Sequence, residues 1–438
     1  MSTRSEELFR QALEVLPGGV SRNTLLRSPH PFYVASASGC RTTDVEGIER
    51  IDWANNMASL IHGHAHPAVV EAVSDQLTRG TAFTMATEAE VRFAQHLVGR
   101  SPSFDKVRFV NSGTEAVMAG LKAARAFTDR PKLAKIEGTY HGAYDYAEVS
   151  QSPQPARWGQ AHQPSSVALA RGTPSGVVDD VVVLPFGDTE AALAVLEAHR
   201  GQLACVLLDP IPHRAGLVPV DPDFAKALRD WTRDDGSLLL FDEVITFRTE
   251  VGGMQARLPV QPDLTAMGKM IGGGFPVGAL AGSDEVMAVF TSSGAGPRLP
   301  HSGTFSANPI TMTAGRVAME LFDEAAVQRL NGLGRLSRQL LEEAIAVAGA
   351  PASVSGAGSM FRVHFKPERP HDYRSSFPTP DEKRALTTFI DEMATRGHML
   401  VYSGAGMLST PMTEAEITAL AEAAVPALRR ATETLTRR

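Results

Sequence analysis

Short apolar runs alternate with amphipathic stretches through the middle of the chain. Five of these runs have the length and composition of strands, and they span residues 107–110, 133–136, 181–184, 204–208 and 238–241. Strands that are apolar along their whole length are buried on both faces, as in a parallel sheet covered by helices. The pattern therefore predicts an α/β domain built on a mainly parallel sheet.

The two ends of the chain have a different pattern. Residues 5–16 place apolar side chains on one helical face, and Pro17-Gly18-Gly19 ends that helix. Beyond about residue 310, a helix over 310–322 precedes strand-like runs over 356–365 and 400–408. A capping box formed by Thr413 and Glu416 then begins a terminal helix. The ends therefore predict a second, smaller α+β domain to which both termini contribute.

These patterns divide the chain into three parts. We expect residues 1–50 and 311–438 to form the small domain, and residues 51–310 to form the large one. Residues 151–178 interrupt the large domain with several prolines and little periodic apolar content. A long irregular segment of this kind is either a functional lid or a surface excursion, and we expect a lid over the active site.

Composition narrows the class of protein. The 438 residues are 43% hydrophobic and 21% charged, which is typical of a soluble globular protein of about two domains. The net charge of -7 gives no basic surface for nucleic acid, and no apolar run is long enough to span a membrane. The N-terminal residues are charged where a signal peptide is apolar, and the two cysteines lack metal or disulfide spacing. We expect a cytoplasmic protein.

Two residues indicate the chemistry. Asp242 follows the apolar run 238–241, and Lys269 lies among glycines 27 residues later. An aldehyde cofactor such as pyridoxal phosphate needs a lysine to bind its aldehyde and an acid to keep its ring nitrogen protonated. Taken singly, such an acid is more often a turn residue and such a lysine a solvated surface charge.

Two turns at strand ends add candidate ligands. The strand at 107–110 leads through Ser112, Gly113 and Thr114 into a helix, whose free N–H groups and hydroxyls suit one phosphate group. An ordinary helix cap explains these residues equally well. Tyr140 and His141 follow the next strand, where the tyrosine either stacks on a pyridine ring or belongs to a loop.

Five motifs in order give the chain a family resemblance. They are Asn-Ser-Gly-Thr-Glu-Ala at 111–116, Tyr-His-Gly at 140–142, Phe-Asp-Glu-Val at 241–244, Gly-Lys-x-Ile-Gly-Gly-Gly at 268–274 and His-Ser-Gly-Thr-Phe-Ser-Ala-Asn-Pro at 301–309. The chain resembles class III (fold type I) pyridoxal-phosphate aminotransferases over nearly its whole length. It is most similar to the branch with glutamate-1-semialdehyde aminomutase and the β-phenylalanine aminotransferases.

The resemblance implies roles for single residues. Lys269 would bind the cofactor aldehyde and carry the proton, and Asp242 would pair with the ring nitrogen. Thr304 resembles the threonine that reaches the phosphate of a neighbouring subunit, which implies a homodimer with shared active sites. The remaining cofactor contacts implied are Ser112, Gly113 and Thr114 at the phosphate, Tyr140 and Val244 on the two ring faces, and His141 beside Tyr140.

The substrate side is less constrained by sequence. Arg22 falls where β-amino-acid aminotransferases have a carboxylate-binding arginine, and Arg27 is a second candidate. Residues 402–408 lack the second arginine of the β-phenylalanine enzymes, and they also lack the aminomutases' glutamate-containing segment. His213 and Arg214 either supply the missing positive charge or form a structural pair.

We therefore expect a homodimeric aminotransferase with a ping-pong mechanism, with a β-amino acid such as β-phenylalanine as the first donor to consider. The alternative is an intramolecular aminomutase of the glutamate-1-semialdehyde type; racemisation and decarboxylation are less favoured. An inactive cofactor-binding protein is disfavoured because Lys269, Asp242, Tyr140 and Thr304 are all present. The histidines at 62, 64 and 66 match a family loop, so we assign no metal.

Overall fold

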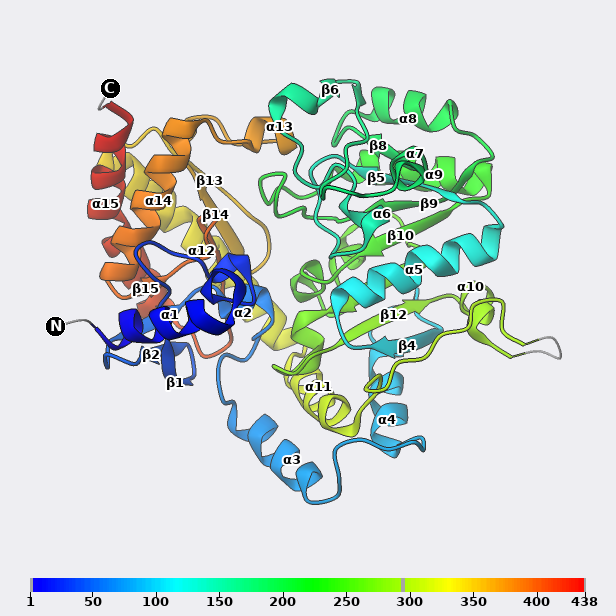
Figure 1. Cartoon of the computed structure of the whole chain (residues 1–438), viewed down its shortest axis with the longest axis horizontal. Coiled ribbons are helices and arrows are strands. Elements are labelled where there is room, and N and C mark those ends of the chain that lie inside the picture. Colours follow the sequence, from blue (N-terminus) through cyan, green and yellow to red (C-terminus); the bar gives the residue numbers. More distant parts are fainter. Residues whose placement is uncertain (1–2, 293–295, 437–438) are drawn as a thin grey trace.

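The protein consists of two lobes with the large sheet in one of them (Figure 1). A computed structural model describes residues 3–292 and 296–436. The larger lobe holds a seven-stranded sheet, and the smaller lobe holds a four-stranded and a three-stranded sheet beside long helices. None of the described helices is long and apolar enough to cross a membrane.

The large sheet has the strand order β4-β12-β11-β10-β9-β5-β8. Strands β8, β5, β9, β10 and β11 run parallel to one another, whereas β12 is antiparallel to both β11 and β4. The bounds are β4 (Lys106–Val110), β5 (Lys132–Ile136), β8 (Val181–Leu184), β9 (Leu203–Leu208), β10 (Leu238–Asp242), β11 (Leu264–Gly268) and β12 (Gly278–Gly282). All five strands expected from sequence are present, and the predicted α/β fold is confirmed.

Helices bury both faces of this sheet. On one face, β5, β9 and β10 pack against α8 (Thr189–Glu197) and α9 (Pro222–Asp235). On the other face, the same strands pack against α5 (Gly113–Thr128). The remaining helices of this lobe are α2 (Asn55–Ala58), α3 (Pro67–Leu77), α4 (Glu88–Val98), α6 (Asp145–Glu148), α7 (Ser175–Asp179), α10 (Asp284–Met287) and α11 (Pro309–Leu321).

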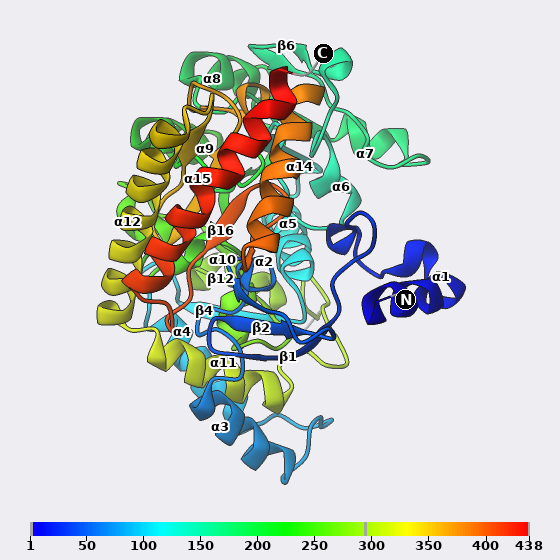
Figure 2. The same cartoon turned by 90° about the vertical axis from the view of Figure 1, so that its left-hand side faces the viewer.

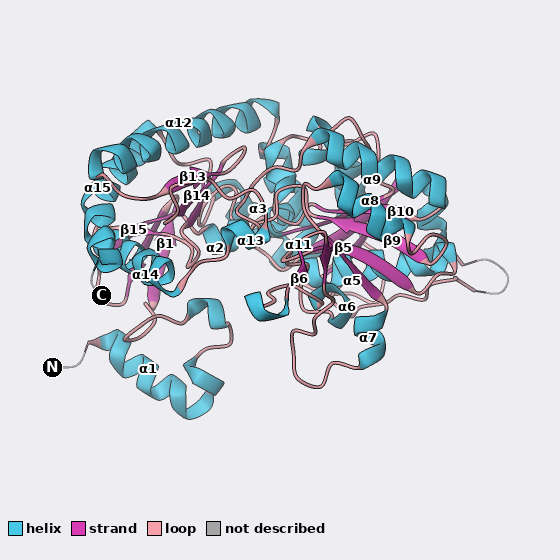
Figure 3. Ribbon diagram, turned by 90° about the horizontal axis from the view of Figure 1, so that it is seen from above, coloured by secondary structure: helices cyan, strands magenta, loops and turns pink. Residues whose placement is uncertain are grey.

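Both termini contribute to the smaller lobe. Strand β15 (His398–Met399) pairs in parallel with β3 (Glu49–Asp52), so the two ends of the chain share one sheet. Helices α12, α15 and α14 lie side by side (Figure 2), and α1 stands apart from the rest of the lobe (Figure 3). The bounds are α1 (Arg4–Val15), β1 (Val34–Ser38), β2 (Arg41–Asp44), α12 (Glu324–Ala348), β13 (Ser353–Ser355), β14 (Met360–His364), α13 (Tyr373–Ser376), α14 (Pro380–Thr395), β16 (Ala405–Met407) and α15 (Glu414–Thr436).

Residues 151–178 form short regular elements instead of one irregular loop. They contain the two-stranded hairpin of β6 (Gly159–Gln160) and β7 (Gln163–Pro164), followed by α7. The segment packs at the edge of the large lobe, beside α13 of the smaller lobe (Figure 1). Its function as a lid stays a prediction.

Candidate active site

A cavity of about 340 Å³ lies at the carboxyl ends of the parallel strands. In a sheet of this type, ligands bind outside the carboxyl ends of the strands, where neighbouring strand ends converge. Most of the residues selected from sequence line it: Arg22, Ser112, Gly113, Thr114, Tyr140, His141, His213, Arg214, Asp242, Val244 and Lys269. Segments separated by more than 200 residues in sequence therefore meet at one site.

Lys269 directly follows β11, in a backbone conformation with φ of 50°. Gly268 before it passes so close to α5 that an added Cβ would lie 3.3 Å from the Gly113 Cα. Burial lowers the pKa of the Lys269 amine, and the carboxylates of Asp242 and Asp209 oppose that shift. The cavity thus contains an amine that is more readily deprotonated than a surface lysine.

Asp242 ends β10 and is held by two hydrogen bonds. Its Oδ1 accepts from the Val244 N–H at 3.0 Å, and its Oδ2 lies 2.7 Å from His141 Nδ1. The Nε2 of His141 lies 2.8 Å from the Thr139 hydroxyl, which itself donates to the Ile136 carbonyl at 2.7 Å. Burial lowers the pKa of His141, and Asp242 opposes the shift. His141 therefore orients the carboxylate of Asp242.

The Ser-Gly-Thr turn serves as a cap and as part of the cavity wall. Ser112 Oγ accepts a hydrogen bond from the Glu115 N–H at 3.1 Å, which caps α5. Ser112, Gly113 and Thr114 also line the cavity at the N-terminus of this 16-residue helix. A Cβ added to Gly113 would lie 2.9 Å from Val244 Cγ1. The two interpretations left open by the sequence are compatible, since one turn can cap the helix and face an anion.

Two arginines also line the cavity. The Nη1 of Arg22 donates to Asn56 Oδ1 at 2.8 Å, and the Nη1 of Arg214 donates to Ser152 Oγ at 2.8 Å. The guanidinium carbon of Arg214 lies 5.3 Å from the centroid of the Tyr140 ring. The cavity thus combines an amine and an acid with two guanidinium groups.

Three residues named from sequence, Arg27, His213 and Thr304, differ from the other candidate residues of the site. Arg27 does not line the cavity, because its Nη2 pairs with Asp391 Oδ1 at 2.5 Å and its guanidinium covers the Phe32 ring. Burial and nearby cations lower the pKa of His213 well below its usual value, so His213 is neutral and the expected extra positive charge comes from Arg214 alone. Thr304 is exposed and outside the cavity of its own chain. Its contact with a neighbouring subunit stays a prediction.

Sequence analysis missed two residues at this site. Arg362 in β14 lies opposite Ala405 of β16, and it donates to the carbonyls of His213 at 2.6 Å and Ser403 at 3.2 Å. Burial lowers its pKa to about 10, so it remains a cation at neutral pH. Its strand therefore supplies positive charge next to the one that lacks an arginine.

Asp209 is the other missed residue. It follows β9, the strand beside β10, and its carboxylate lines the cavity. Burial and the nearby Asp242 raise the pKa of Asp209 well above its usual value. An acid directly after an apolar strand was the available signal, and it is the same signal that identified Asp242.

Comparison with known proteins assigns the chain to a family. A family model described as aminotransferase class-III matches residues 26–420. The chain belongs to the class-III aminotransferases. It is 41% identical over 371 residues to a glutamate-1-semialdehyde 2,1-aminomutase of Methanothermobacter thermautotrophicus. The aligned region covers 84% of this chain and 86% of the relative.

Solved structures of the family have the same fold. An omega-transaminase from Sphaerobacter thermophilus matches with a TM-score of 0.96 and 47% identity over 98% of each chain. A β-phenylalanine aminotransferase from Variovorax paradoxus matches with a TM-score of 0.85 and 31% identity over 96% of this chain and 93% of that one. Fold type I is thereby confirmed.

Pyridoxal 5'-phosphate is the cofactor of this class-III family, as the resemblance implied. The cavity suits it chemically. A helix N-terminus with two hydroxyls suits its phosphate, a buried carboxylate suits its ring nitrogen, and a lysine with lowered pKa suits its aldehyde. Among the described residues, no group of three or more His, Cys, Asp or Glu is placed to hold a metal ion.

Proposed function

We propose that this class-III enzyme is an aminotransferase that moves an amino group from an amino-carboxylate donor to an oxo acid. The observation that carries the proposal is the composition of one cavity, which joins Lys269 and Asp242 to the guanidinium groups of Arg22 and Arg214. Planar guanidinium groups match carboxylates geometrically, and an amino acid brings both a carboxylate and an amine.

Under this proposal, each residue of the cavity has a separate role in binding the cofactor or moving a proton. When bound, pyridoxal phosphate supplies an aldehyde that takes up the amino group and a ring that accepts electrons. Lys269 binds the aldehyde, and its Nζ accepts and returns the proton of the reacting carbon. Asp242, oriented by His141, keeps the ring nitrogen protonated. Ser112, Gly113 and Thr114 hold the phosphate at the start of α5.

The cavity wall favours an apolar donor, and one of the structural relatives supports amino transfer between two substrates. Met57, Ile245 and Met407 give part of the wall an apolar character, which suits a donor with a hydrocarbon or aromatic substituent. The omega-transaminase, at 47% identity over 98% of both chains, is described as a transaminase. Under this proposal a β-amino acid such as β-phenylalanine is one donor to test.

Intramolecular amino transfer is the second candidate. The relatives at 35–41% identity are named glutamate-1-semialdehyde 2,1-aminomutase, and these names support the aminomutase better than they support a β-amino-acid donor. An aminomutase returns the amine to the same carbon skeleton and needs no separate acceptor. The requirement for an acceptor therefore separates the two candidates.

The proposal includes a homodimer with shared active sites. Thr304 is exposed in the single chain, and the neighbouring Phe305 is 58% exposed, which is unusual for a large aromatic side chain. Burial of this loop against a second copy, with Thr304 at the partner's phosphate, accounts for both. Light scattering of the Phe305→Ser protein tests the dimer, because loss of an apolar contact would shift it towards monomer.

Product analysis with and without an oxo acid tests the function. Purified holoenzyme is incubated with β-phenylalanine, 3-aminobutanoate, glutamate, alanine or glutamate-1-semialdehyde, each in the presence and absence of 2-oxoglutarate and pyruvate. Multiple turnovers only when an oxo acid is added support the aminotransferase. Multiple turnovers of glutamate-1-semialdehyde without any oxo acid establish the aminomutase instead.

A further inference from the structure

The four-residue helix α13 belongs to the smaller lobe and lies where that lobe meets the larger one (Figure 1). Its conformation is fixed by a capping box, in which the Ser375 N–H donates to Asp372 Oδ1 at 2.7 Å and the Asp372 N–H donates to Ser375 Oγ at 3.0 Å. Reciprocal caps of this kind hold even a single helical turn in one orientation. The side chains of Tyr373, Arg374 and Ser376 therefore leave the helix in fixed directions.

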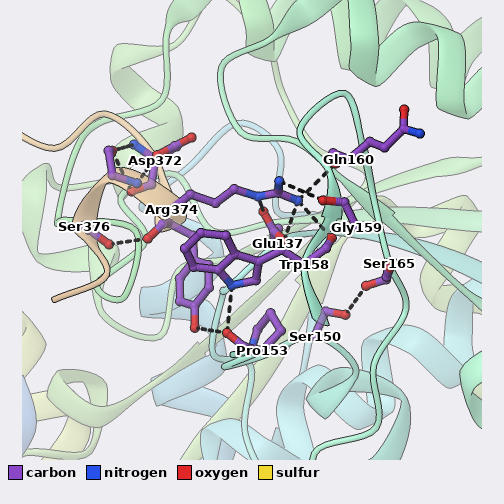
Figure 4. A network of polar contacts seen from close by, with 12 residues as sticks. Glu137, Ser150, Pro153, Trp158, Gly159, Gln160, Ser165, Asp372, Arg374 and Ser376 are labelled. Atoms are coloured by element: carbon purple, nitrogen blue, oxygen red, sulfur yellow. Dashed lines mark hydrogen bonds and ion pairs between the residues drawn. The ribbon is translucent and has the colours of Figure 1, made fainter. Parts of the chain in front are cut away.

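Arg374 forms a two-pronged ion pair with a buried carboxylate (Figure 4). Its Nε donates to Glu137 Oε2 at 2.8 Å, and its Nη2 donates to Glu137 Oε1 at 3.0 Å. Glu137 is 4% exposed, and burial raises its pKa while Arg374 opposes the shift. Glu137 follows β5 and begins the turn that carries Tyr140 and His141, so this pair attaches the smaller lobe to that turn.

The same guanidinium also holds the hairpin of residues 151–178 (Figure 4). Arg374 donates to the carbonyls of Trp158 at 2.9 Å, Gly159 at 3.2 Å and Gln160 at 3.1 Å. Its guanidinium carbon lies 5.3 Å from the centroid of the Trp158 ring. Arg374 thus joins the Tyr140 turn to β6.

The residues on either side of Arg374 fix two further contacts. Tyr373 donates its hydroxyl to the Pro153 carbonyl at 3.0 Å, and it packs so closely on Gly138 that an added Cβ there would lie 2.0 Å from the ring. Ser376 Oγ donates to the backbone carbonyl of Arg214 at 2.8 Å. Three segments are therefore attached to α13: the Tyr140 turn and the Arg214 loop, which line the cavity, and the segment around residue 153.

Arg214 is available for an anion in this arrangement. Its Nη1 donates to Ser152 Oγ, in the segment that α13 holds. Among the described residues, no carboxylate lies within 4.0 Å of its guanidinium nitrogens. Positive charge from Arg362 lies nearby, since the Arg214 guanidinium, after burial, contributes to the lowered pKa of Arg362. A substrate carboxylate would relieve this uncompensated charge.

We propose that Arg374 is a positioning residue for substrate recognition. By joining Glu137 to residues 158–160, it fixes α13, whose Ser376 holds the Arg214 loop where the carboxylate of the amino donor is received. The proposal rests on the proposed function, because it assumes that the donor carries a carboxylate. It assigns the specificity for that carboxylate partly to a side chain that does not line the cavity.

Ligand binding to the holoenzyme provides the first test. The probes are 3-phenylpropanoate, a carboxylate without an amine, and 1-phenylethylamine, an amine without a carboxylate. A misaligned hydrogen bond to a charged group loses about ten- to a hundredfold in affinity, so we expect Arg374→Met to raise the dissociation constant of 3-phenylpropanoate by about tenfold or more. We expect 1-phenylethylamine to react within about twofold of the wild-type rate. Arg374→Lys retains the charge, so its dissociation constant for 3-phenylpropanoate should lie between those of the wild type and Arg374→Met.

Matched variants separate positioning from general damage. Arg369→Met removes an exposed arginine of the same loop, whose ion pair with Glu342 lies far from Glu137, and it should bind both probes as the wild type does. Glu137→Gln keeps the size of the side chain and removes the charge that Arg374 binds, so it should weaken 3-phenylpropanoate binding as Arg374→Met does. It therefore provides the test if the Arg374→Met protein does not fold. Trypsin cleavage after the exposed Arg157 should accelerate in Arg374→Met and Glu137→Gln but not in Arg369→Met.

Two outcomes would overturn the positioning role. One is a folded Arg374→Met protein that binds 3-phenylpropanoate as tightly as the wild type. The other is an equal loss for the amine and the carboxylate, which would indicate general disturbance of the cavity. If the wild-type protein transfers no amino group from any donor, the proposed function is wrong. Binding of 3-phenylpropanoate and the rate of trypsin cleavage still test the role of Arg374 in that case.

Discussion

The two sides of the cavity are built differently. On the cofactor side, Asp242, Lys269 and the Ser112 turn follow strands β10, β11 and β4 of one sheet. On the substrate side, Arg22 comes from the N-terminal segment, and Arg214 is held by Ser152 and by α13 of the smaller lobe. The first side depends on strand ends within one sheet, whereas the second depends on contacts between segments that are distant in sequence.

This difference implies that variants on the cofactor side affect the rate, and that variants on the substrate side affect which molecule is used. A cofactor-side residue acts on every donor, since every donor reacts at the same aldehyde. A substrate-side arginine acts only on donors with a carboxylate. The predictions below test this division, beginning with the largest expected effect.

Replacing Lys269 should have the largest effect. We expect Lys269→Ala to lose at least about a thousandfold in turnover with every donor, because it removes the residue that accepts and returns the proton. Steady-state assays of amino transfer measure the loss. Lys226→Ala, which removes an exposed lysine paired with Asp230 on α9, is the control and should leave turnover unchanged. Wild-type turnover by Lys269→Ala would refute the assignment of the site.

Asp242→Asn should have the second-largest effect on turnover. The amide cannot keep the ring nitrogen cationic, so we expect turnover to fall by roughly a hundredfold or more while the cofactor stays bound. Cofactor content by absorbance and turnover are measured on the same sample. Asp230→Asn serves as the surface control. An unchanged rate would show that Asp242 acts only through the structure of its loop.

Arg214→Met should change selectivity more than rate. Loss of a hydrogen bond to a charged group costs about 1.5–3 kcal/mol, so we expect the KM of an amino-carboxylate donor to rise about 10- to 100-fold. The kcat for 1-phenylethylamine should change little. Arg200→Met, at an exposed ion pair with Glu197, is the matched control. If Arg22→Met alone raises this KM and Arg214→Met does not, the carboxylate is bound at the N-terminal segment.

Stability should depend on pH through Lys135, the smallest effect we predict. Lys135 is buried, and its Nζ donates to the carbonyls of Thr139 at 3.2 Å and Val149 at 2.8 Å. Burial lowers its pKa from 10.5 to about 7. Between these two pKa values the unfolded chain binds the proton and the folded chain does not, so this residue makes the free energy of unfolding rise as pH rises.

The prediction is that Lys135→Met flattens the rise in unfolding free energy between about pH 7 and pH 10.5. Denaturant unfolding across that range measures the slope for both proteins. Lys132→Met, at the exposed start of the same strand, should retain the wild-type slope. An equal slope in Lys135→Met and wild type would show that Lys135 does not release its proton on folding.

The sequence was sufficient for the cofactor side and insufficient for much of the substrate side. Five apolar runs predicted five strands, and the five motifs of the family resemblance, more than the acid or the lysine alone, indicated Asp242 and Lys269, which both line the cavity. Strands β11 and β12 were missed because glycine and alanine make them less apolar than their neighbours. Neither missed strand changed the predicted fold class.

On the substrate side, each arginine needed a contact that sequence does not show. Arg27 resembles a candidate ligand, but Asp391, 364 residues away, binds it outside the cavity. Nothing in the sequence of its strand marks Arg362 as a residue near the cavity. Its place there is set by its hydrogen bonds to the carbonyls of His213 and Ser403. Long-range pairing of charged side chains decided both cases.

The central claim is that the amino group moves between two substrate molecules, and a single-turnover experiment tests it most directly. Holoenzyme is mixed with several equivalents of an amino-carboxylate donor per site without any oxo acid, and the cofactor absorbance and the products are followed together. The account predicts one equivalent of oxo product per site, an absorbance change that persists, and its reversal only after an oxo acid is added. Consumption of several equivalents of substrate, with the absorbance returning unaided, would contradict it.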